Sequence, residues 1–434
     1  MKPCRLYLIV TTALASMIGL AVKAETITVA TVNNGDMVRM QALTSEFNKK
    51  YPDIKVEWVT LEENILREKV TTDIATQGGQ YDVMTIGTYE VPIWGKNKWL
   101  SPLEFSKSYD VEDIIPVIRD GLTVDSKLYA APFYAESSMI MYRTDLMKKA
   151  SLEMPEKPSW TFIEKAAKAM TNKDEGVYGI CLRGKAGWGE NMALITAMAN
   201  SFGARWFNED WEAQFDTQEW AKTLETYLNL MQNYGPPGAS SNGFNENLAL
   251  FQQGKCGMWI DATVAGSFVT HPTDSKVADR VDFALAPDAG LGKRTSWLWA
   301  WTLAIPASSE KKESAQKFIA WATSKEYLNM VAENEGWANV PPGTRQSLYE
   351  NEKYAALPFA QITLESINAA DPKNPSVKPV PYIGVQFVAI PEFQSIGTRV
   401  GQEFSAALAG QKSAKAALKA AQFTTQREMD KAGY

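Results

Sequence analysis

The sequence of 434 residues predicts an α/β protein, and two observations lead to that prediction. Segments that alternate apolar and polar side chains, or that form short apolar runs, are followed repeatedly by segments with apolar residues at helical spacing. Several of these strands end in polar or aromatic residues, where the carboxyl ends of parallel strands form a ligand-binding edge. The composition, with 45% hydrophobic and 22% charged residues, excludes a disordered chain, a collagen-like repeat and a polytopic membrane protein.

The first strand-helix-strand unit begins at residue 26. Residues 26–32 alternate as a strand does, and a polar turn comes next. Apolar residues then recur at helical spacing at Met37, Met40, Leu43 and Phe47. The sequence therefore predicts a helix over 37–50, ended by Tyr51-Pro52, and a second strand over 54–59. A helical crossover between two strands of one sheet makes the two strands parallel.

The alternation continues through the rest of the chain, without an internal repeat. Further strands are predicted near 81–86, 137–142, 179–183, 255–261, 281–286 and 297–305. Further helices are predicted near 61–77, 162–170, 190–201, 224–231, 315–330, 394–409 and 413–430. Ser159 is the predicted N-cap of the helix that contains Phe162.

Residues 1–24 have the features of a secretory signal peptide. Lys2 and Arg5 form a positive start, and residues 6–20 form a mostly apolar run. That run is shorter than the roughly 20 residues that a membrane-spanning helix needs. We therefore expect cleavage after Ala24 and release into a Gram-negative periplasm, because a cell without an outer membrane would lose an unanchored protein.

The charge of the exported chain argues against nucleic acid as a partner. Removing residues 1–24 takes away Lys2, Arg5 and Lys23 and no acidic residue, so the formal net charge falls from −6 to −9. Nucleic-acid binding needs a basic surface that neutralises phosphates.

Cysteine and histidine usage limits the chemistry further. Only Cys181 and Cys256 remain after the signal peptide is removed, so either one disulfide or two buried thiols are possible. His271 is the single histidine, so a metal site that needs two histidines is excluded. We expect neither a metal nor a cofactor.

Polar residues at the ends of the first and third strands are candidate ligand contacts. Asn34 and Asp36 follow the first strand, and Thr88 follows the third. Asp36 has a second interpretation as the N-cap of the helix over 37–50. The two interpretations are compatible, because a polar loop at a helix start can cap the helix and bind hydroxyl groups.

Trp297, Trp299 and Trp301 alternate at period two, which places all three on one face of a strand. Such a row is either a core stripe or the wall of a binding site. Flat aromatic faces beside polar groups suit sugars and polyols, and a buried indole N–H needs a hydrogen-bond partner. We expect at least one of the three indoles to contact a ligand.

Two loops combine aromatic residues with hydrogen-bonding groups. The first spans residues 183–191, where Arg183 and Trp188 lie among glycines that permit unusual backbone conformations. The second carries Trp337 and Asn339. Each is either a binding loop or an ordinary solvent-exposed loop.

Glu136 and Asp261 lie at the ends of predicted strands, and their carboxylates allow two interpretations. A pair of acids at the right separation would make a glycosidase. Without chemistry, both carboxylates would accept hydrogen bonds from ligand hydroxyl groups.

Six segments in this order resemble the bacterial extracellular solute-binding proteins of ABC importers, the broad family that contains maltose-binding protein. The resemblance covers essentially the whole exported chain and is nearest to the mannitol/sorbitol (polyol)-binding members. The matching segments are 27–36, 47–56, 81–84, 131–143, 251–259 and 301–306.

The resemblance implies a periplasmic-binding-protein-like fold of type II, with two α/β lobes joined by hinge strands and a ligand cleft between them. The implied first lobe comprises residues 25–133 and 281–335, and the second comprises residues 134–280 and 336–434. The resemblance implies ligand contacts at Asn34, Asp36, the loop after Ile86, Glu136, the loop around Trp188, Asp261, and Trp299 or Trp301. Together with the residues considered above, the predicted ligand-binding residues are Asn34, Asp36, Thr88, Glu136, Arg183, Trp188, Asp261, Trp297, Trp299, Trp301 and Trp337.

One departure from the family pattern concerns ligand size. Where maltose-binding relatives carry an acid after the third strand, this chain has Thr88-Tyr89. The absence of this acid is consistent with a ligand that is smaller than maltose or linear. We therefore predict a monomeric, non-enzymatic receptor that delivers a neutral sugar alcohol of the mannitol, sorbitol and arabitol class to the permease subunits of an ABC transporter. One alternative is a receptor of the same fold that binds a mono- or oligosaccharide. A secreted glycosidase is the less favoured alternative.

Overall fold

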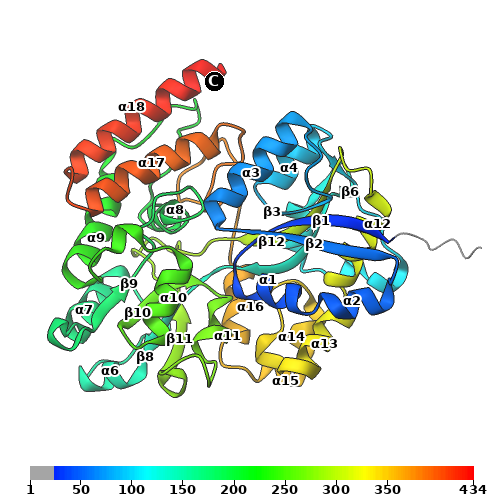
Figure 1. Ribbon diagram of the computed structural model, residues 1–434. Coiled ribbons are helices and arrows are strands. Elements are labelled where there is room, and N and C mark those ends of the chain that lie inside the picture. The colour runs from blue at the N-terminus through cyan, green and yellow to red at the C-terminus, as the bar shows by residue number, and fades with distance from the viewer. Residues whose placement is uncertain (1–23) are drawn as a thin grey trace, which may run out of the picture.

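Two separate β-sheets, each covered by helices, form two lobes in the computed structural model, which describes residues 24–434 (Figure 1). The predicted α/β class and the two-lobed architecture are confirmed. The signal-peptide prediction concerns residues 1–24, all but the last of which lie outside the described range. Across residues 24–434, no helix combines the length and the apolar character that crossing a bilayer requires.

The first lobe is built on a six-stranded sheet with the order β2-β1-β3-β12-β4, in which β7 also pairs with β12. β1 pairs in parallel with β2 and with β3, as predicted from the helical crossover. The elements of this lobe are β1 (Glu25–Val32), α1 (Gly35–Ala42), α2 (Thr44–Lys50), β2 (Ile54–Leu61), α3 (Glu63–Thr76), β3 (Val83–Gly87), α4 (Glu90–Lys96), β4 (Leu100–Ser101), α5 (Pro116–Gly121), β5 (Thr123–Val124), β6 (Lys127–Leu128), β7 (Ala130–Glu136), β12 (Trp299–Pro306), α12 (Lys312–Ala322), α13 (Lys325–Glu335), η6 (Trp337–Asn339), α14 (Gln346–Glu350) and α15 (Glu352–Ala355).

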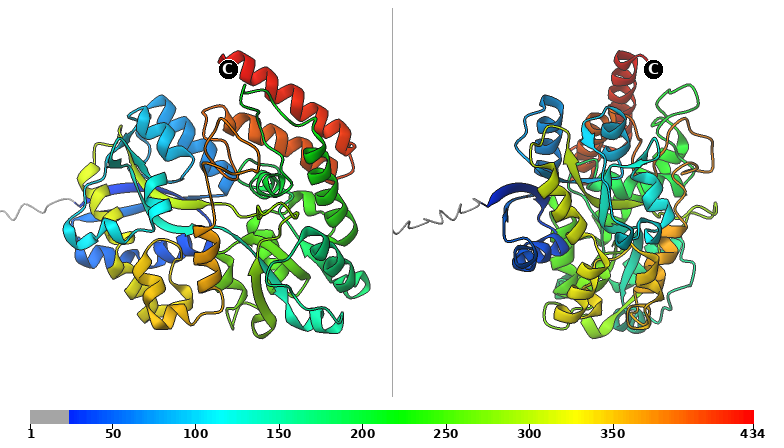
Figure 2. Two further views of the ribbon diagram at one scale, coloured as in Figure 1. Left: turned by 180° about the vertical axis from the view of Figure 1, so that it is seen from behind. Right: turned by 90° about the vertical axis from the view of Figure 1, so that its right-hand side faces the viewer.

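The second lobe is built on a four-stranded sheet with the order β11-β8-β10-β9. The two long helices α17 and α18 lie together along its outer side, as all views show (Figure 2). The elements of this lobe are β8 (Ser138–Arg143), α6 (Thr144–Lys149), α7 (Trp160–Met170), β9 (Tyr178–Cys181), α8 (Asn191–Ser201), α9 (Gln218–Tyr234), α10 (Phe244–Gln252), β10 (Cys256–Ala262), α11 (Ala265–Val269), β11 (Val281–Leu285), α16 (Ala360–Asn368), α17 (Phe393–Leu408) and α18 (Ala414–Ala432).

The chain passes between the lobes three times, and the passages differ from the predicted boundaries. β7 stays in the first sheet up to Glu136, and β8 begins the second sheet at Ser138. β11 pairs with β8, so residues 281–285 belong to the second sheet and not to the first lobe as predicted. Arg345 lies within the range 336–434 that is predicted for the second lobe. It donates hydrogen bonds, however, to the carbonyl groups of Asp110 and Thr323 in the first lobe. The third passage therefore lies between α15 and α16.

Two predicted helices are each divided in two. The helix expected over 37–50 is interrupted at Leu43, next to Thr44, whose hydroxyl donates to the Met40 carbonyl. The helix expected over 315–330 is divided at Ser324, whose hydroxyl accepts from the Tyr327 amide and begins α13. Ser159 caps α7 as predicted, accepting from the Phe162 amide.

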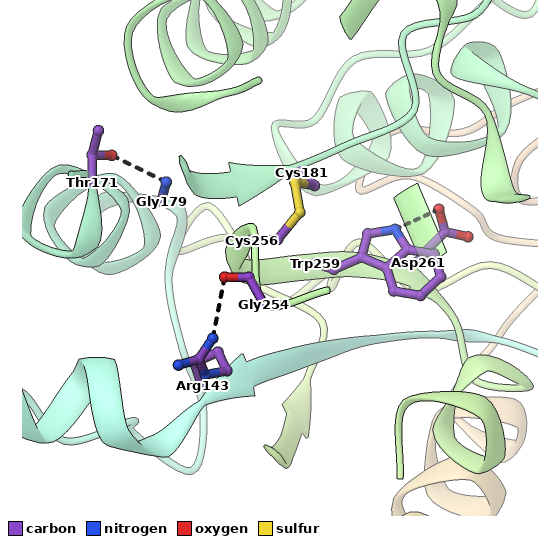
Figure 3. Close-up of a disulfide and its surroundings, with 8 residues drawn as sticks. All are labelled: Arg143, Thr171, Gly179, Cys181, Gly254, Cys256, Trp259 and Asp261. Carbon is purple, nitrogen blue, oxygen red and sulfur yellow. Dashed lines mark hydrogen bonds between the residues drawn. A yellow bond between two sulfur atoms is a disulfide. The ribbon is translucent and has the colours of Figure 1, made fainter. Parts of the chain in front are cut away.

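A disulfide joins Cys181 at the end of β9 to Cys256 at the start of β10 (Figure 3). This resolves the alternative that the sequence left open. β9 is a four-residue strand at the edge of its sheet, and it pairs in parallel with β10. The covalent bond therefore fixes a short edge strand two residues before Arg183.

Replacing both cysteines by serine should lower the free energy of unfolding by about 2–4 kcal/mol, because the bridge closes a loop with a sequence separation of 75 and restricts the unfolded chain. Urea unfolding of the oxidised wild type and of the Cys181→Ser/Cys256→Ser variant measures this difference. The same comparison with the wild type fully reduced is the control, since the two proteins should then have nearly equal stability. Equal stability under oxidising conditions would contradict the prediction.

Candidate functional site

A small cavity lies between the two lobes, and both lobes contribute to its walls. The lining residues are Asn34, Glu63, Arg67, Tyr134, Glu136, Arg183, Trp188, Gly189, Ala193, Phe244, Val264, Trp297, Trp299, Trp301 and Gln386. Aromatic and ionisable side chains therefore dominate the walls.

The first-lobe wall is built by the antiparallel pairing of β7 with β12. In this register Glu136 lies opposite Trp299, and Tyr134 lies opposite Trp301. Because strand side chains alternate between faces, all four of these residues project from the same face. Gly87 on β3 makes room for the row, since a Cβ atom there would lie 1.9 Å from the Trp299 ring.

The indole of Trp299 has an unpaired hydrogen-bond donor. Its Nε1 atom is buried and has no partner among the described residues. A buried unpaired donor costs free energy, so it is expected to be satisfied by a group that enters the site. Trp299 lies close to Trp188 and Trp301, with ring centroids 5.8 and 5.4 Å away.

Arg67 on α3 stands among three indoles. Its guanidinium carbon lies 4.0 Å from the ring centroid of Trp188, 4.7 Å from that of Trp299 and 4.8 Å from that of Trp301. Glu63 accepts from Nε and Nη2 of Arg67, and Glu90 accepts from Nη1. A guanidinium group has five N–H donors, so donors on Arg67 remain for a further acceptor.

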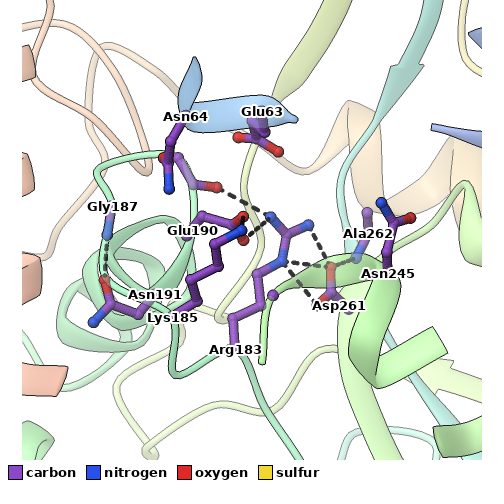
Figure 4. Close-up of polar contacts among 12 residues, drawn as sticks. Glu63, Asn64, Arg183, Lys185, Gly187, Glu190, Asn191, Asn245, Asp261 and Ala262 are labelled. Atoms are coloured by element: carbon purple, nitrogen blue, oxygen red, sulfur yellow. Dashed lines mark hydrogen bonds and ion pairs between the residues drawn. The ribbon is translucent and has the colours of Figure 1, made fainter. Parts of the chain in front are cut away.

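Arg183 in the second lobe is held by Asp261 (Figure 4). Nε and Nη2 of Arg183 donate to the Asp261 carboxylate at 2.9 and 2.7 Å, and Nη1 donates to the Gly189 carbonyl at 3.0 Å. The Trp259 indole and the Ala262 amide also donate to Asp261. The Asp261 oxygens are therefore occupied by protein donors, and their effect is to orient Arg183.

Each guanidinium group at the cavity is already paired with carboxylates of the protein, Arg67 with Glu63 and Glu90, and Arg183 with Asp261. Glu63 and Glu136 are the carboxyl groups that line the cavity. Burial raises the pKa of Glu136 well above its usual value, against the attraction of Arg183. Burial lowers the pKa of Arg183, but the charge and hydrogen bonds of Asp261, together with the charges of Glu190 and Glu63, raise it well above its usual value. Such a site suits an uncharged ligand, since a buried net charge without a partner is costly.

A seam of polar contacts joins the two lobes beside Arg183, and Figure 4 shows Asn64, Lys185 and Glu190 of this seam. Lys185 of the second lobe contacts Glu62 of the first lobe at 2.5 Å, and the Asn64 amide donates to the Ala186 carbonyl at 3.3 Å. Glu190 is buried at this seam, and its Oε2 accepts no hydrogen bond. Burial and the nearby Glu63 raise the pKa of Glu190 to about 8.

Seven of the eleven residues predicted for the site line the cavity, and four do not. Asp36 instead pairs with Arg39, and the N-cap position of α1 belongs to Asn34. Thr88 is buried in the turn before α4, Asp261 is occupied by Arg183, and Trp337 lies in η6 beside α13. The seven lining residues are Asn34, Glu136, Arg183, Trp188, Trp297, Trp299 and Trp301.

The sequence reasoning missed several polar residues of the cavity. Tyr134 lies two residues before Glu136 on one strand, so the strand alternation alone could have identified it. Glu63 and Arg67 are four residues apart on a helix, a spacing that also occurs on solvent-exposed helices. Gln386 lies in an irregular segment, and no periodicity marks it.

Two α/β lobes that enclose a polar and aromatic cavity define a receptor that captures a small molecule between its lobes. The chain belongs to the family of bacterial extracellular solute-binding proteins, whose model matches residues 33–328. It is 58% identical over 416 residues to a mannitol-binding protein of Pseudomonas aeruginosa, an alignment that covers 96% of this chain and 95% of the relative.

Solved structures agree with this assignment. An ABC transporter solute-binding protein from Agrobacterium vitis S4, with bound D-mannitol, is 71% identical and superposes with a TM-score of 0.94, covering 95% of this chain and 100% of that one. A solute-binding protein from Agrobacterium radiobacter K84, in complex with ribitol, is 24% identical with a TM-score of 0.82, over 94% of this chain and 99% of that one. The second likeness shows the common fold alone.

Glu190→Gln should make the stability of the protein less dependent on pH. The pKa of Glu190 is about 8 in the folded protein against a usual value of 4.5, so the folded state holds its proton more tightly than the unfolded chain does. The stability linked to this proton is full below about pH 4.5 and is lost as the pH rises towards 8.

Urea unfolding of both proteins at pH 5 and pH 8 tests this linkage. Between pH 5 and pH 8, the free energy of unfolding should fall by at least about 1 kcal/mol more in the wild type than in the variant. Glu219→Gln is a suitable control, because Glu219 is only partly buried and its pKa is lowered by a hydrogen bond from Lys378. A constant difference between Glu190→Gln and wild type at the two pH values would contradict the assignment.

Proposed function

We propose that this protein is the periplasmic receptor of an ABC importer for D-mannitol and related sugar alcohols. The observation that carries the proposal is the cavity between the lobes, where both guanidinium groups are paired with protein carboxylates and an indole donor is unpaired. The mannitol-binding relative and the mannitol-bound structure support the ligand class, because both match nearly the whole chain at high identity.

Each kind of cavity group has a role towards a polyol. Arg67, Arg183 and the Trp299 indole donate hydrogen bonds to hydroxyl oxygens. Glu63, Glu136 and the Asn34 carbonyl accept hydrogen bonds from hydroxyl groups, and charge-assisted bonds of this kind are the stronger ones. Trp188, Trp297 and Trp301 offer flat faces to the C–H groups of the carbon chain. A linear hexitol has both hydroxyl groups and apolar C–H edges along its whole length.

Binding favours the closed arrangement of the lobes because the ligand contacts both of them. Glu136 and Trp299 belong to the first lobe, whereas Arg183 and Trp188 belong to the second. A ligand held by all four has more contacts when the lobes are closed, and its differential affinity shifts the population towards that state. The closed form is then the state that the permease subunits receive.

The ligand leaves this protein chemically unchanged in our proposal. A glycosidase would need Glu136 and Asp261 as a working pair of acids. The Asp261 carboxylate accepts from Arg183, Trp259 and Ala262, so it has no free oxygen to offer a substrate. We further propose export to the periplasm after cleavage of the signal peptide, and action as a monomer.

Calorimetric titration with D-mannitol, D-sorbitol, D-arabitol and maltose tests the proposed function. We expect saturable heat with the sugar alcohols and no heat with maltose. The dissociation constant for the sugar alcohols should be micromolar or lower, which corresponds to a binding free energy of about 8 kcal/mol or more. Chromatography of the recovered mannitol should show it unaltered. Heat from maltose alone, or a converted ligand, would overturn the proposal.

Trp299→Phe should weaken mannitol binding about tenfold or more without lowering the stability of the ligand-free protein by a comparable amount. The substitution keeps an aromatic wall and removes an N–H group that has no partner in the described structure. Calorimetry gives the affinity, and thermal unfolding without ligand gives the stability.

Trp206→Phe is the matched control for that substitution. The Trp206 indole donates to Thr196 inside the second lobe, away from the cavity. This control should lose stability and keep its affinity for mannitol. If Trp299→Phe instead lost stability and kept its affinity, the Trp299 indole would be a core residue and not a ligand contact.

A further inference from the structure

Tyr89 is a first-lobe residue whose ring is buried against the second lobe. It stands immediately before α4, and its side chain is only 2% exposed. Its ring centroid lies 4.8 Å from Trp188, 5.6 Å from Phe387 and 6.0 Å from Phe393. Trp188 and Phe393 pack within the second lobe, against α17 and Trp206 respectively. Tyr89 therefore contributes an aromatic contact between the lobes.

The Tyr89 hydroxyl adds a polar contact to the aromatic one. It donates to the Ile390 carbonyl at 2.9 Å. Burial raises the pKa of this hydroxyl, so it keeps its proton and remains a donor at physiological pH. In the closed arrangement, the Tyr89 ring is packed against aromatic side chains and its hydroxyl group has a hydrogen-bond acceptor.

The segment that accepts this hydrogen bond also reaches the ligand cavity. Gln386, four residues before Ile390, lines the cavity. Its side chain accepts from the Leu298 amide at 3.2 Å and donates to the Leu298 carbonyl at 2.8 Å. Leu298 lies between Trp297 and Trp299, so this segment joins the Tyr89 contact to the indole wall. Tyr89 itself does not line the cavity.

We propose that Tyr89 is a positioning residue that raises affinity by holding the lobes closed from outside the ligand cavity. The proposal rests on the proposed function. Separation of the lobes would remove the ring from its aromatic neighbours and break the bond to Ile390. The Tyr89 contact therefore stabilises the closed state alone, and apparent affinity rises with the fraction of the protein that is closed.

A contact that favours closure without touching the ligand has a distinctive signature. Every ligand that binds the closed cavity gains the same factor in affinity, so the preference between two ligands stays the same. A residue that contacts the ligand changes that preference, because two stereoisomers present their hydroxyl groups differently. The ratio of affinities for D-mannitol and D-sorbitol thus separates a positioning role from a contact role.

The test compares the wild type with Tyr89→Ala and Tyr89→Phe by calorimetry with both hexitols. Tyr89→Ala should weaken both affinities about tenfold or more and by the same factor, since it removes the ring and the hydroxyl. Tyr89→Phe restores the ring and should recover part of the affinity. Without ligand, Tyr89→Ala should have a larger radius of gyration by X-ray scattering than the wild type.

Tyr109→Phe is the matched control. Tyr109 is a buried first-lobe tyrosine whose hydroxyl contacts Thr323 of the same lobe at 2.7 Å. Removing this hydroxyl should lower the melting temperature and leave both hexitol affinities unchanged. The control thus distinguishes a general loss of stability from a loss of closure.

Two results would overturn the proposal while mannitol binds the wild type: a folded Tyr89→Ala variant with unchanged affinities, or one with an altered ratio of mannitol to sorbitol affinity. If neither hexitol binds the wild type, the proposed function fails by itself. The scattering of the ligand-free proteins then decides the role of Tyr89, and equal radii of gyration for wild type and Tyr89→Ala would contradict it.

Discussion

Four buried ionisable side chains surround a small cavity between two lobes, and the need to pair them is the constraint on which the site depends. Removing one partner from a buried ion pair costs about 3–5 kcal/mol, so each charge must be matched where it stands. Asp261 holds Arg183, whereas Glu63 and Glu90 hold Arg67. Glu63 is four residues from Arg67 on α3, but Glu90 lies 23 residues away and Asp261 lies 78 residues from Arg183, so those two pairings require the folded lobes.

The fold meets this constraint through the way its two sheets are joined. β7 and β12 pair in the first lobe and place Glu136 beside Trp299, while β10 in the second lobe carries Asp261. The disulfide fixes β9 against β10 just before Arg183, so that the arginine and its carboxylate partner stay in register. Contacts across the seam, such as Lys185 with Glu62, belong to the closed arrangement and not to either lobe alone. Ligand capture and closure are thus parts of one equilibrium.

Sequence patterns predicted the local elements and the indole wall, but not the pairing of charges. Period-two spacing placed Trp299 and Trp301 on one face because that spacing is a local property of a strand. Trp297, predicted on the same strand face, lines the cavity from the segment before β12, which begins at Trp299. Asp36 and Asp261 have the residue type and strand-end position of ligand contacts, yet each is engaged by a protein guanidinium, Arg39 and Arg183 respectively. Which carboxylate is engaged by the protein depends on distances between remote segments. For the same reason β11, a plain apolar strand in the sequence, gave no sign of which sheet it joins.

The central claim is that the closed cavity selects an uncharged polyol because its two guanidinium groups are already paired with protein carboxylates. The most direct measurement is a calorimetric comparison of D-mannitol with two charged analogues of similar size, D-mannonate and 1-amino-1-deoxy-D-mannitol, in one buffer at neutral pH. The account predicts that both analogues bind at least about a hundredfold more weakly than D-mannitol, because the guanidinium groups are already paired and either ligand charge would be buried in excess. Binding of either analogue as tight as that of D-mannitol would contradict it.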